Sequence, residues 1–126
     1  MGLFSVFTTN SGVIDSTQLA EDFERIITNS EKIEVGFKLN ENTFIFTDKR
    51  LILIEVRKDG DKAYEYISLP YSKISTFSVE SKKSFGYKSR LKIWLNGQEL
   101  PQLDKEFNKS IDVYEVQKIL ANHVLN

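Results

Sequence analysis

Apolar and polar residues alternate over most of the chain between Ile33 and about Leu103, and this period of two is the feature that most constrains the fold. In the stretch 33–39, every second residue is apolar, as expected for a strand with one buried face. Short polar turns separate such stretches, which is typical of antiparallel hairpins. The pattern therefore predicts a meander of strands in a curved antiparallel sheet.

The turn signals divide this region into strands. Asp59-Gly60 and Asn96-Gly97 favour tight hairpins because glycine adopts positive φ without steric cost. Pro70 and Pro101 cannot donate a hydrogen bond, so each marks a strand end or an edge. Two sheets, or one sharply bent sheet, are expected. The predicted strands are 33–39, 43–47, 50–57, about 62–69, 74–80, 87–95 and about 98–104.

Helical periodicity appears on both sides of the strand region. Asp15 and Gln18 resemble a capping box at the start of an N-terminal helix, whose apolar stripe would be Leu19, Phe23, Ile26 and Ile27. Asn10-Ser11-Gly12, before it, is interpreted as a loop. Ser110 is predicted to cap a C-terminal helix with Val113, Val116, Ile119, Leu120 and Val124 on one stripe. The fold class is therefore α+β, with a seven-stranded sheet that curls into a barrel and a C-terminal helix that covers its open end.

Composition narrows the class of protein. A chain of 126 residues with 40% hydrophobic and 28% charged residues has the size and balance of one globular domain. The absence of cysteine favours a reducing compartment, so a cytoplasmic location is predicted. The longest apolar run, Leu51–Ile54, is far shorter than the ~20 residues that cross a membrane. A net charge of −1 argues against general attraction to nucleic acid, and no nucleic-acid partner is expected.

Several segments together resemble the bacterial pleckstrin-homology-like (PH-like) domain family, formerly a family of unknown function, over essentially the full length. They are Met1–Phe4, Phe46–Ile54, Leu69–Ile74, Phe77–Glu80 and Leu91–Trp94. The resemblance implies a seven-stranded, strongly bent β-barrel with a capping C-terminal helix, homo-oligomers such as rings, and no established catalytic activity. It also implies an added N-terminal helix, which divides the chain into a segment 1–29 and a PH-like domain 30–126. The basic and aromatic stretch 84–90 departs from the acidic turn that the family often has there.

The inventory of catalytic side chains is small. The only histidine, His123, is three residues from the C-terminus on the final helix, where a solvated side chain is expected rather than a catalytic base. There is no cysteine nucleophile, and the carboxylates are scattered among turns. We therefore predict no enzyme activity, no catalytic residue, no metal and no cofactor.

Two features suggest association with other chains. The apolar N-terminal segment and the helical stripe either pack over the barrel or form an oligomer interface. Strand 74–80, rich in Ser and Thr and free of proline, could pair with a neighbouring subunit or an extended peptide. The candidate interface residues are Leu3, Phe4, Phe7, Leu19, Phe23, Ile26, Ile74, Thr76 and Ser78.

A basic cluster offers a second kind of site, for a membrane surface or single-stranded nucleic acid, although such clusters are usually solvated strand ends. Its residues are Lys82, Lys83, Lys88, Arg90 and Lys92. The first hairpin loop, Asn40-Glu41-Asn42, has an acidic centre where a phosphate clamp would need cations. Trp94 is out of phase with Leu91 and Ile93, so it either packs under the C-terminal helix or anchors an interface, and Tyr71 and Phe77 carry the same ambiguity.

The sequence thus predicts a non-catalytic PH-like scaffold or interaction domain. It would self-associate, with a ring as one arrangement, and bind a protein or peptide partner. The alternative is a peripheral membrane or phospholipid-headgroup binding module that uses the basic cluster.

Overall fold

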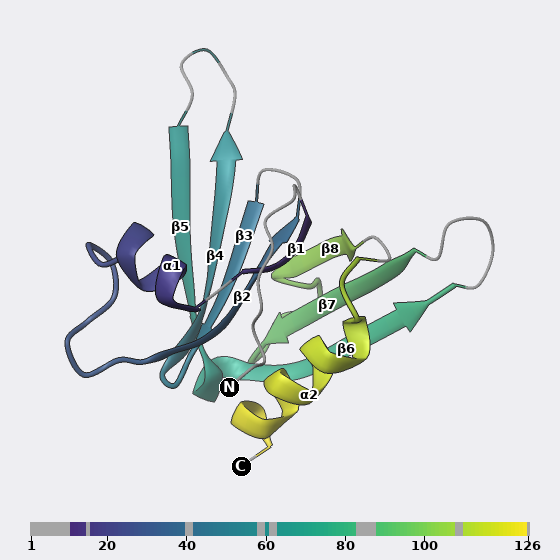
Figure 1. The fold of residues 1–126 in the computed structure, drawn as a ribbon. Coiled ribbons are helices and arrows are strands. Elements are labelled where there is room, and N and C mark those ends of the chain that lie inside the picture. The colour runs from purple at the N-terminus through teal and green to yellow at the C-terminus, as the bar shows by residue number, and fades with distance from the viewer. Residues whose placement is uncertain are drawn as a thin grey trace. The chain divides into compact units, whose positions relative to one another are not determined.

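The computed structural model describes residues 11–14, 16–39, 42–57, 60, 63–82, 88–107 and 110–125. The chain divides into two compact units, Met1–Leu69 and Pro70–Asn126. Each unit contains one sheet and one α-helix (Figure 1). The predicted separation of residues 1–29 from residues 30–126 stays a prediction.

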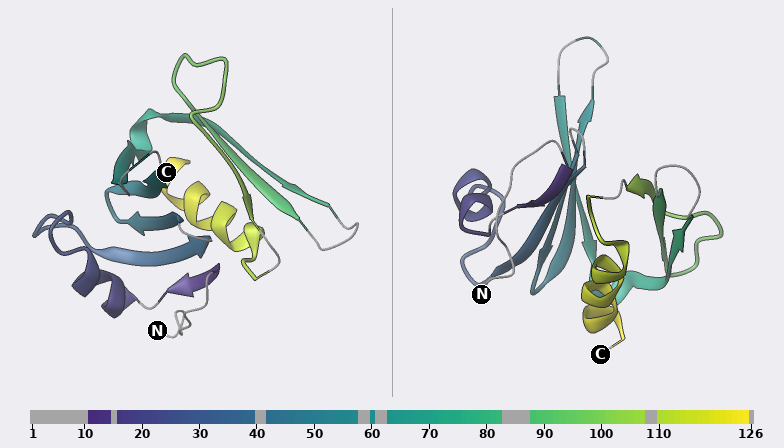
Figure 2. Two further views of the ribbon diagram at one scale, coloured as in Figure 1. Left: turned by 90° about the horizontal axis from the view of Figure 1, so that it is seen from above. Right: turned by 45° about the vertical axis from the view of Figure 1, so that its right-hand side comes forward.

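The first unit is a five-stranded sheet in the order β1-β2-β3-β4-β5, so strands adjacent in sequence are also adjacent in space. Figure 2 shows the helix α1 beside β2, with which it is in contact. The elements of this unit are β1 (Ser11–Ile14), α1 (Ser16–Asp22), β2 (Ile33–Leu39), β3 (Asn42–Thr47), β4 (Arg50–Arg57) and β5 (Ala63–Pro70).

Both faces of this sheet carry buried side chains, which explains why β3 and β4 read as nearly continuous apolar runs. On one face the buried cluster of Ile45, Ile52 and Ile54 is covered by partly buried Phe23, Ile26, Ile27 and Ile33. On the other face the rings of Phe37 and Phe46 meet edge to face at 6.1 Å. Further buried residues of that face are Phe44, Leu51 and Leu53.

The N-terminal region differs from the prediction in two ways. Ser11 and Gly12 belong to strand β1, which pairs antiparallel with β2, rather than to a loop. The helix spans only Ser16–Asp22, so Phe23 and Ile26 of the expected stripe lie beyond its end. Their turn is held by the Ile26 amide, which donates to the Phe23 carbonyl at 3.0 Å. Packing onto the sheet outweighs the helical period here because these apolar side chains reach the isoleucine cluster from a turn.

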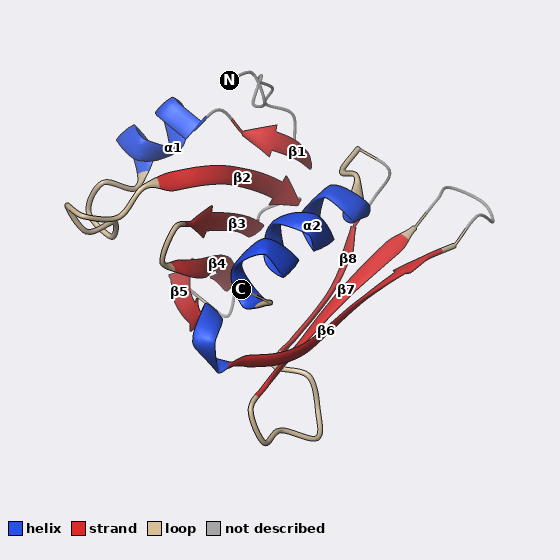
Figure 3. Ribbon diagram, turned by 90° about the horizontal axis from the view of Figure 1, so that it is seen from below, coloured by secondary structure: helices blue, strands red, loops and turns tan. Residues whose placement is uncertain are grey.

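The second unit is a three-stranded antiparallel sheet in the order β6-β7-β8, with α2 against it (Figure 3). The helix contacts β6, β7 and η1. Gly97, in the turn that follows β7, has a φ of 83°, which glycine adopts without strain. The elements are η1 (Tyr71–Lys73), β6 (Ile74–Ser81), β7 (Ser89–Leu95), β8 (Leu103–Phe107) and α2 (Val113–Val124).

The helix α2 buries three residues of the predicted stripe, leaves Ile119 and Val124 partly buried, and begins at a different cap. Val113, Val116 and Leu120 are buried, as the sequence predicted. The side chain of Asp112, rather than Ser110, accepts a hydrogen bond from the Tyr114 amide at 3.0 Å. Aspartate ranks with serine as an N-cap, so the sequence alone did not separate the two positions.

The α+β fold class is confirmed, since the seven predicted strands are present as β2 to β8, with helices at both ends. β1 adds a further short strand. Two details of the prediction are wrong. The last strand is Leu103–Phe107 instead of 98–104, because residues 96–102 form the turn that Asn96-Gly97 begins. The strands do not close into a barrel, because strand pairing joins them into two separate sheets in the described residues.

The packing of α2 can be tested by shortening one buried leucine. Leu120 is fully buried, whereas Leu125, just past the helix end, is 72% exposed. We expect Leu120→Ala to lower the free energy of unfolding in urea by about 2–5 kcal/mol. Leu125→Ala should change it by less than about 0.5 kcal/mol. Equal effects of the two substitutions would contradict the packing described.

Candidate functional site

The carboxylate of Glu31, whose side chain is 1% exposed, accepts several hydrogen bonds in the first unit. Arg50 binds it with two nitrogens: Nε donates to one carboxylate oxygen at 2.8 Å and Nη2 donates to the other at 3.0 Å. This two-point geometry is the strongest arrangement open to an arginine and a carboxylate. Because Arg50 begins β4, the ion pair fixes the segment before β2 to the β3–β4 turn.

Threonines complete the shell around this carboxylate. The Thr47 hydroxyl donates to Glu31 at 2.6 Å and accepts from the backbone amides of Lys49 and Arg50 at 3.0 Å each. The backbone amide of Thr28 donates to the other carboxylate oxygen at 3.2 Å. Both carboxylate oxygens of Glu31 thus accept hydrogen bonds, which offsets the cost of burying the negative charge.

These bonds lower the pKa of Glu31 from 4.5 to about 2. The hydrogen bonds from Arg50 are the largest cause; burial acts in the opposite direction, and Thr47 and Thr28 add to the lowering. A carboxylate held so firmly in its charged form is a poor proton carrier near neutral pH. Its role is to hold the fold.

Arg50 also reaches two further elements. Its Nη2 donates to the carbonyl of Ile26 at 2.6 Å, and its Nη1 donates to the Ser68 hydroxyl on β5 at 2.8 Å. One guanidinium therefore holds the segment 23–32, which covers the isoleucine cluster, against the sheet. The same segment is also bonded to the β3–β4 turn through Lys32 and Asp48. The Lys32 amide donates to the Asp48 carboxylate at 2.8 Å, and the Asp48 amide donates to the Lys32 carbonyl at 2.9 Å.

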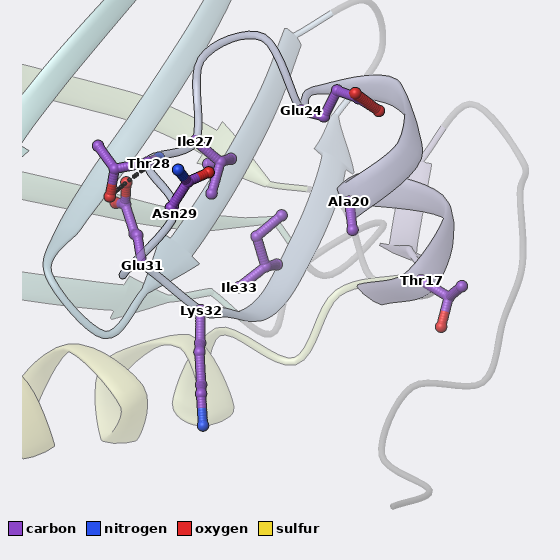
Figure 4. A pocket seen from close by; sticks show the side chains of 9 residues that line it. All are labelled: Thr17, Ala20, Glu24, Ile27, Thr28, Asn29, Glu31, Lys32 and Ile33. Atoms are coloured by element: carbon purple, nitrogen blue, oxygen red, sulfur yellow. Dashed lines mark hydrogen bonds between the residues drawn. The ribbon is translucent and has the colours of Figure 1, made fainter.

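We call the ion pair of Glu31 and Arg50 the clamp. A groove of about 620 Å³ lies beside Glu31 of this clamp. Figure 4 shows Thr17, Ala20 and Glu24 on one side of it and the 27–31 segment on the other. Its walls mix small, apolar and charged groups, and its one buried carboxylate, Glu31, is already fully bonded. Within the described ranges, no three His, Asp or Glu side chains gather in a way that could hold a metal ion.

The second unit places the predicted pairing strand at an edge. Among the described strands, β6 pairs with β7 alone, so alternate backbone groups along it face away from the sheet. Thr76 and Ser78 of the candidate interface are exposed on β6, whereas Ile74 is buried. Ile74 therefore lies in the core rather than on the surface, and pairing of β6 with another chain stays a prediction.

The apolar members of the candidate interface have different positions. Phe23 and Ile26 are partly buried and pack on the isoleucine cluster, which supports intramolecular packing of this stripe. Leu19 lies on α1. Leu3, Phe4 and Phe7 lie outside the described residues, as do Asn40 and Glu41 of the first hairpin loop.

The basic cluster is only partly assembled and includes acidic neighbours. Lys82, Lys88 and Arg90 line a small pocket of about 110 Å³ together with Ser89, Glu80 and Glu106. Arg90 forms an ion pair with Asp104 at 2.7 Å, and Lys92 lies opposite the same aspartate in the register of β7 and β8. Lys83 lies outside the described residues. Carboxylates on β6 and β8 thus offset much of the positive charge that an anionic surface would need.

Trp94 lies on the same face of the sheet as Thr76, its partner on β6. That face is exposed at Thr76 and Ser78, whereas Leu91 and Ile93 on the other face are buried. Trp94 therefore does not lie under α2. Its indole N–H donates to the Glu99 carbonyl at 3.3 Å. Phe77, on the inner face, is partly buried and belongs with the packing residues.

His123 is not the solvated residue that the sequence predicted. Its ring stacks on that of buried Tyr71 with centroids 4.1 Å apart and planes 3° apart. The stack joins the end of α2 to η1, so Tyr71 is a packing residue. The sequence contained no local signal for this contact because the two residues are 52 positions apart.

Comparison with known proteins defines the class. The family profile of the bacterial PH domain matches residues 2–124. The chain is 40% identical over 121 residues to the uncharacterized protein YjqA of Bacillus subtilis (strain 168), covering 96% of this chain and 97% of that protein. It is 27% identical over 124 residues to the uncharacterized protein YozO of the same organism, covering 98% of each.

Two solved structures of pleckstrin-homology domains are similar to this chain. A DUF1696 family protein with a pleckstrin-homology domain from Shewanella loihica PV-4 superposes with a TM-score of 0.78 at 34% identity, covering 93% of this chain and 99% of that one. A pleckstrin homology domain from Shewanella amazonensis SB2B gives 0.77 at 36% identity, covering 89% and 100%. The chain belongs to the bacterial PH domain family. No helix in the described part of the chain combines the length and apolar character needed to cross a membrane.

The clamp makes a pH-dependent contribution to stability. Because the pKa of Glu31 is about 2 in the folded chain against 4.5 as its ordinary value, its stabilisation is complete above about pH 4.5 and is lost as the pH falls toward 2. The loss should be about 3 kcal/mol. We expect Glu31→Gln to be less stable than wild type at pH 7 and to lack this pH dependence in urea unfolding.

The matched control for the clamp is Glu115→Gln, which removes an exposed ion pair with Lys118 of 3.5 Å. That substitution should change stability by less than about 0.5 kcal/mol. The description of the clamp is contradicted if Glu31→Gln keeps the full acid dependence of the wild type.

The alternative function, binding to a membrane through the basic cluster, can be tested separately. Because Glu80, Asp104 and Glu106 lie among the cations, we expect the chain to sediment equally with phosphatidylserine-containing and pure phosphatidylcholine vesicles at low salt. Selective sedimentation with the anionic vesicles, lost in Lys82→Gln/Lys88→Gln, would show that the basic cluster binds membranes.

Proposed function

We propose that this PH-like domain is a non-catalytic scaffold that self-associates and binds a protein or peptide partner by strand addition at β6. The observation that carries the proposal is the open edge of β6, an eight-residue strand that pairs on one side only within the part of the chain that the structure describes. An exposed edge offers unpaired amides and carbonyls to an added strand.

The composition of β6 favours this use. Soluble proteins usually protect an edge with lysine, proline, a short strand or a strong bulge. Between Ile74 and Ser81 there is no lysine and no proline, and the register shift lies at the very start of the strand. By contrast β8, at the other edge of the same sheet, has five residues, of which Asp104, Lys105 and Glu106 are charged. β6 thus has the features of an edge that accepts a strand, whereas β8 has the features of a protected edge.

The first unit has a comparable edge. β5 is also eight residues long and lies at the end of its sheet. Tyr64 and Tyr66 on it are about half exposed, and tyrosine is enriched at protein interfaces. This strand supports self-association because a scaffold needs more than one contact surface.

A pair of lysine substitutions tests the function at β6. Thr76→Lys/Ser78→Lys adds the residues that natural edges use for protection. We expect wild type to exceed the monomer mass in light scattering as concentration rises, and the variant to remain closer to the monomer.

The control is Ser30→Lys/Asn122→Lys, which adds the same charge at two exposed positions that are not on β6. It should assemble as the wild type does. A wild-type chain that stays monomeric at every concentration, or a β6 variant that assembles normally, contradicts strand addition at this edge as the means of self-association.

A further inference from the structure

We infer that β6 pairs antiparallel with β6 of a second copy of this chain, across a two-fold axis at Ser78. This inference rests on the proposed function, since it names the occupant of the open edge and the register in which it pairs. Its basis is that β6 is complementary to itself in one alignment, in which backbone groups, apolar side chains and charge all agree.

The backbone groups at the open edge of β6 are those of Phe77, Val79 and Ser81. The Lys82 amide donates to the Lys88 carbonyl at 3.0 Å, in the register that joins β6 to β7. Hydrogen-bonded and non-hydrogen-bonded pairs alternate along an antiparallel ladder, so between positions 76 and 82 the even-numbered residues bond to β7. The odd-numbered residues therefore present their amides and carbonyls to the side on which none of the described strands lies.

The apolar face of this sheet is less well covered at β6 than at β7. Leu91 and Ile93 of β7 are fully buried, whereas their cross-strand partners on β6, Val79 and Phe77, are only partly buried. A further strand with apolar side chains beside Val79 and Phe77 would remove more of their surface from water, which favours association. The strand that fits this edge thus has apolar residues directly opposite these two.

One alignment of β6 with itself meets this need. With Ser78 on the two-fold axis, Phe77 faces Val79 of the second copy and Val79 faces Phe77, so apolar cross-strand pairs form in both halves. Both residues have their backbone groups at the edge, so the same pairs exchange hydrogen bonds. Moving the axis by one residue to either side places Phe77 or Val79 opposite a serine.

The charge of the strand agrees with the same alignment. Glu80 is the only ionisable residue between Ile74 and Ser81, and with the axis at Ser78 it faces the hydroxyl side chain of Thr76 in the second copy. An axis at Glu80 itself would bring two carboxylates opposite each other, which destabilises a strand pair. Each copy supplies the same surface to the contact, as a two-fold interface requires.

A single introduced cysteine can report this register because the chain contains none. A residue on the axis faces its own counterpart in a non-hydrogen-bonded pair, with Cα atoms roughly 4.5 Å apart, a separation that a disulfide bridges. We expect Ser78→Cys, at an exposed position, to form a dimer under mild oxidation that reducing agent reverses. The measurement is non-reducing electrophoresis over the concentrations used for light scattering.

The matched control is Thr76→Cys, which is exposed on the same face of β6. In the proposed register residue 76 lies four positions from its own counterpart, roughly 13 Å along the strand and beyond the reach of a disulfide. Its cross-linking should be lower than that of Ser78→Cys by about tenfold or more. A mixture of Thr76→Cys and Glu80→Cys chains should cross-link again, because these two positions face each other.

The outcomes separate this inference from the proposed function. If neither Ser78→Cys nor the mixture cross-links while Thr76→Lys/Ser78→Lys still loses self-association, the inference is wrong and the proposed function stands. If no cross-link forms and the lysine variant assembles normally, or the wild type is monomeric at every concentration, both are wrong. Equal cross-linking of Thr76→Cys and Ser78→Cys, or a Ser78→Cys dimer that the mixture does not reproduce, also overturns the inference.

Discussion

A β-strand satisfies the hydrogen bonds of its backbone only when it has a partner on each side, and among the described strands β6 pairs with β7 alone. The functional account follows from this constraint. In the second unit α2 packs against the sheet, and the two edges of that sheet among the described strands are β8, which is short and charged, and β6, which is neither. A fold that protects one edge and leaves the other free of lysine and proline is suited to accept a strand.

In the first unit, a segment with little helix covers one apolar face of the sheet and must be held there. Arg50 does this by binding a carboxylate, a backbone carbonyl and a hydroxyl from three parts of the chain. The buried pair with Glu31 is stable because Thr47 and Thr28 complete its hydrogen bonds. The residues around this ion pair hold the segment 23–32 against the sheet.

Local patterns predicted most of the sheet but not its long-range contacts. The bounds of β2 and β4 follow from alternation and hairpin turns. The many hydroxyl residues and the missing proline of β6 led to the prediction that this strand pairs with another chain, which stays a prediction. The short strand β1 and the length of α1 depend on tertiary packing, which local propensity does not encode. Glu31 and Arg50 are 19 positions apart, so no periodicity connects them. The acidic neighbours of the basic cluster likewise became visible only with the cross-strand register of β6, β7 and β8.

Hydrogen–deuterium exchange along β6 tests the central claim most directly. The amides of β6 that face away from β7 should exchange rapidly in dilute protein and become protected as concentration rises or a partner strand is added. The charged strand β8 should show no such change. Protection of β6 that is already complete in the monomer, or exchange that is the same at every concentration and with every partner, would contradict an open edge that accepts a strand.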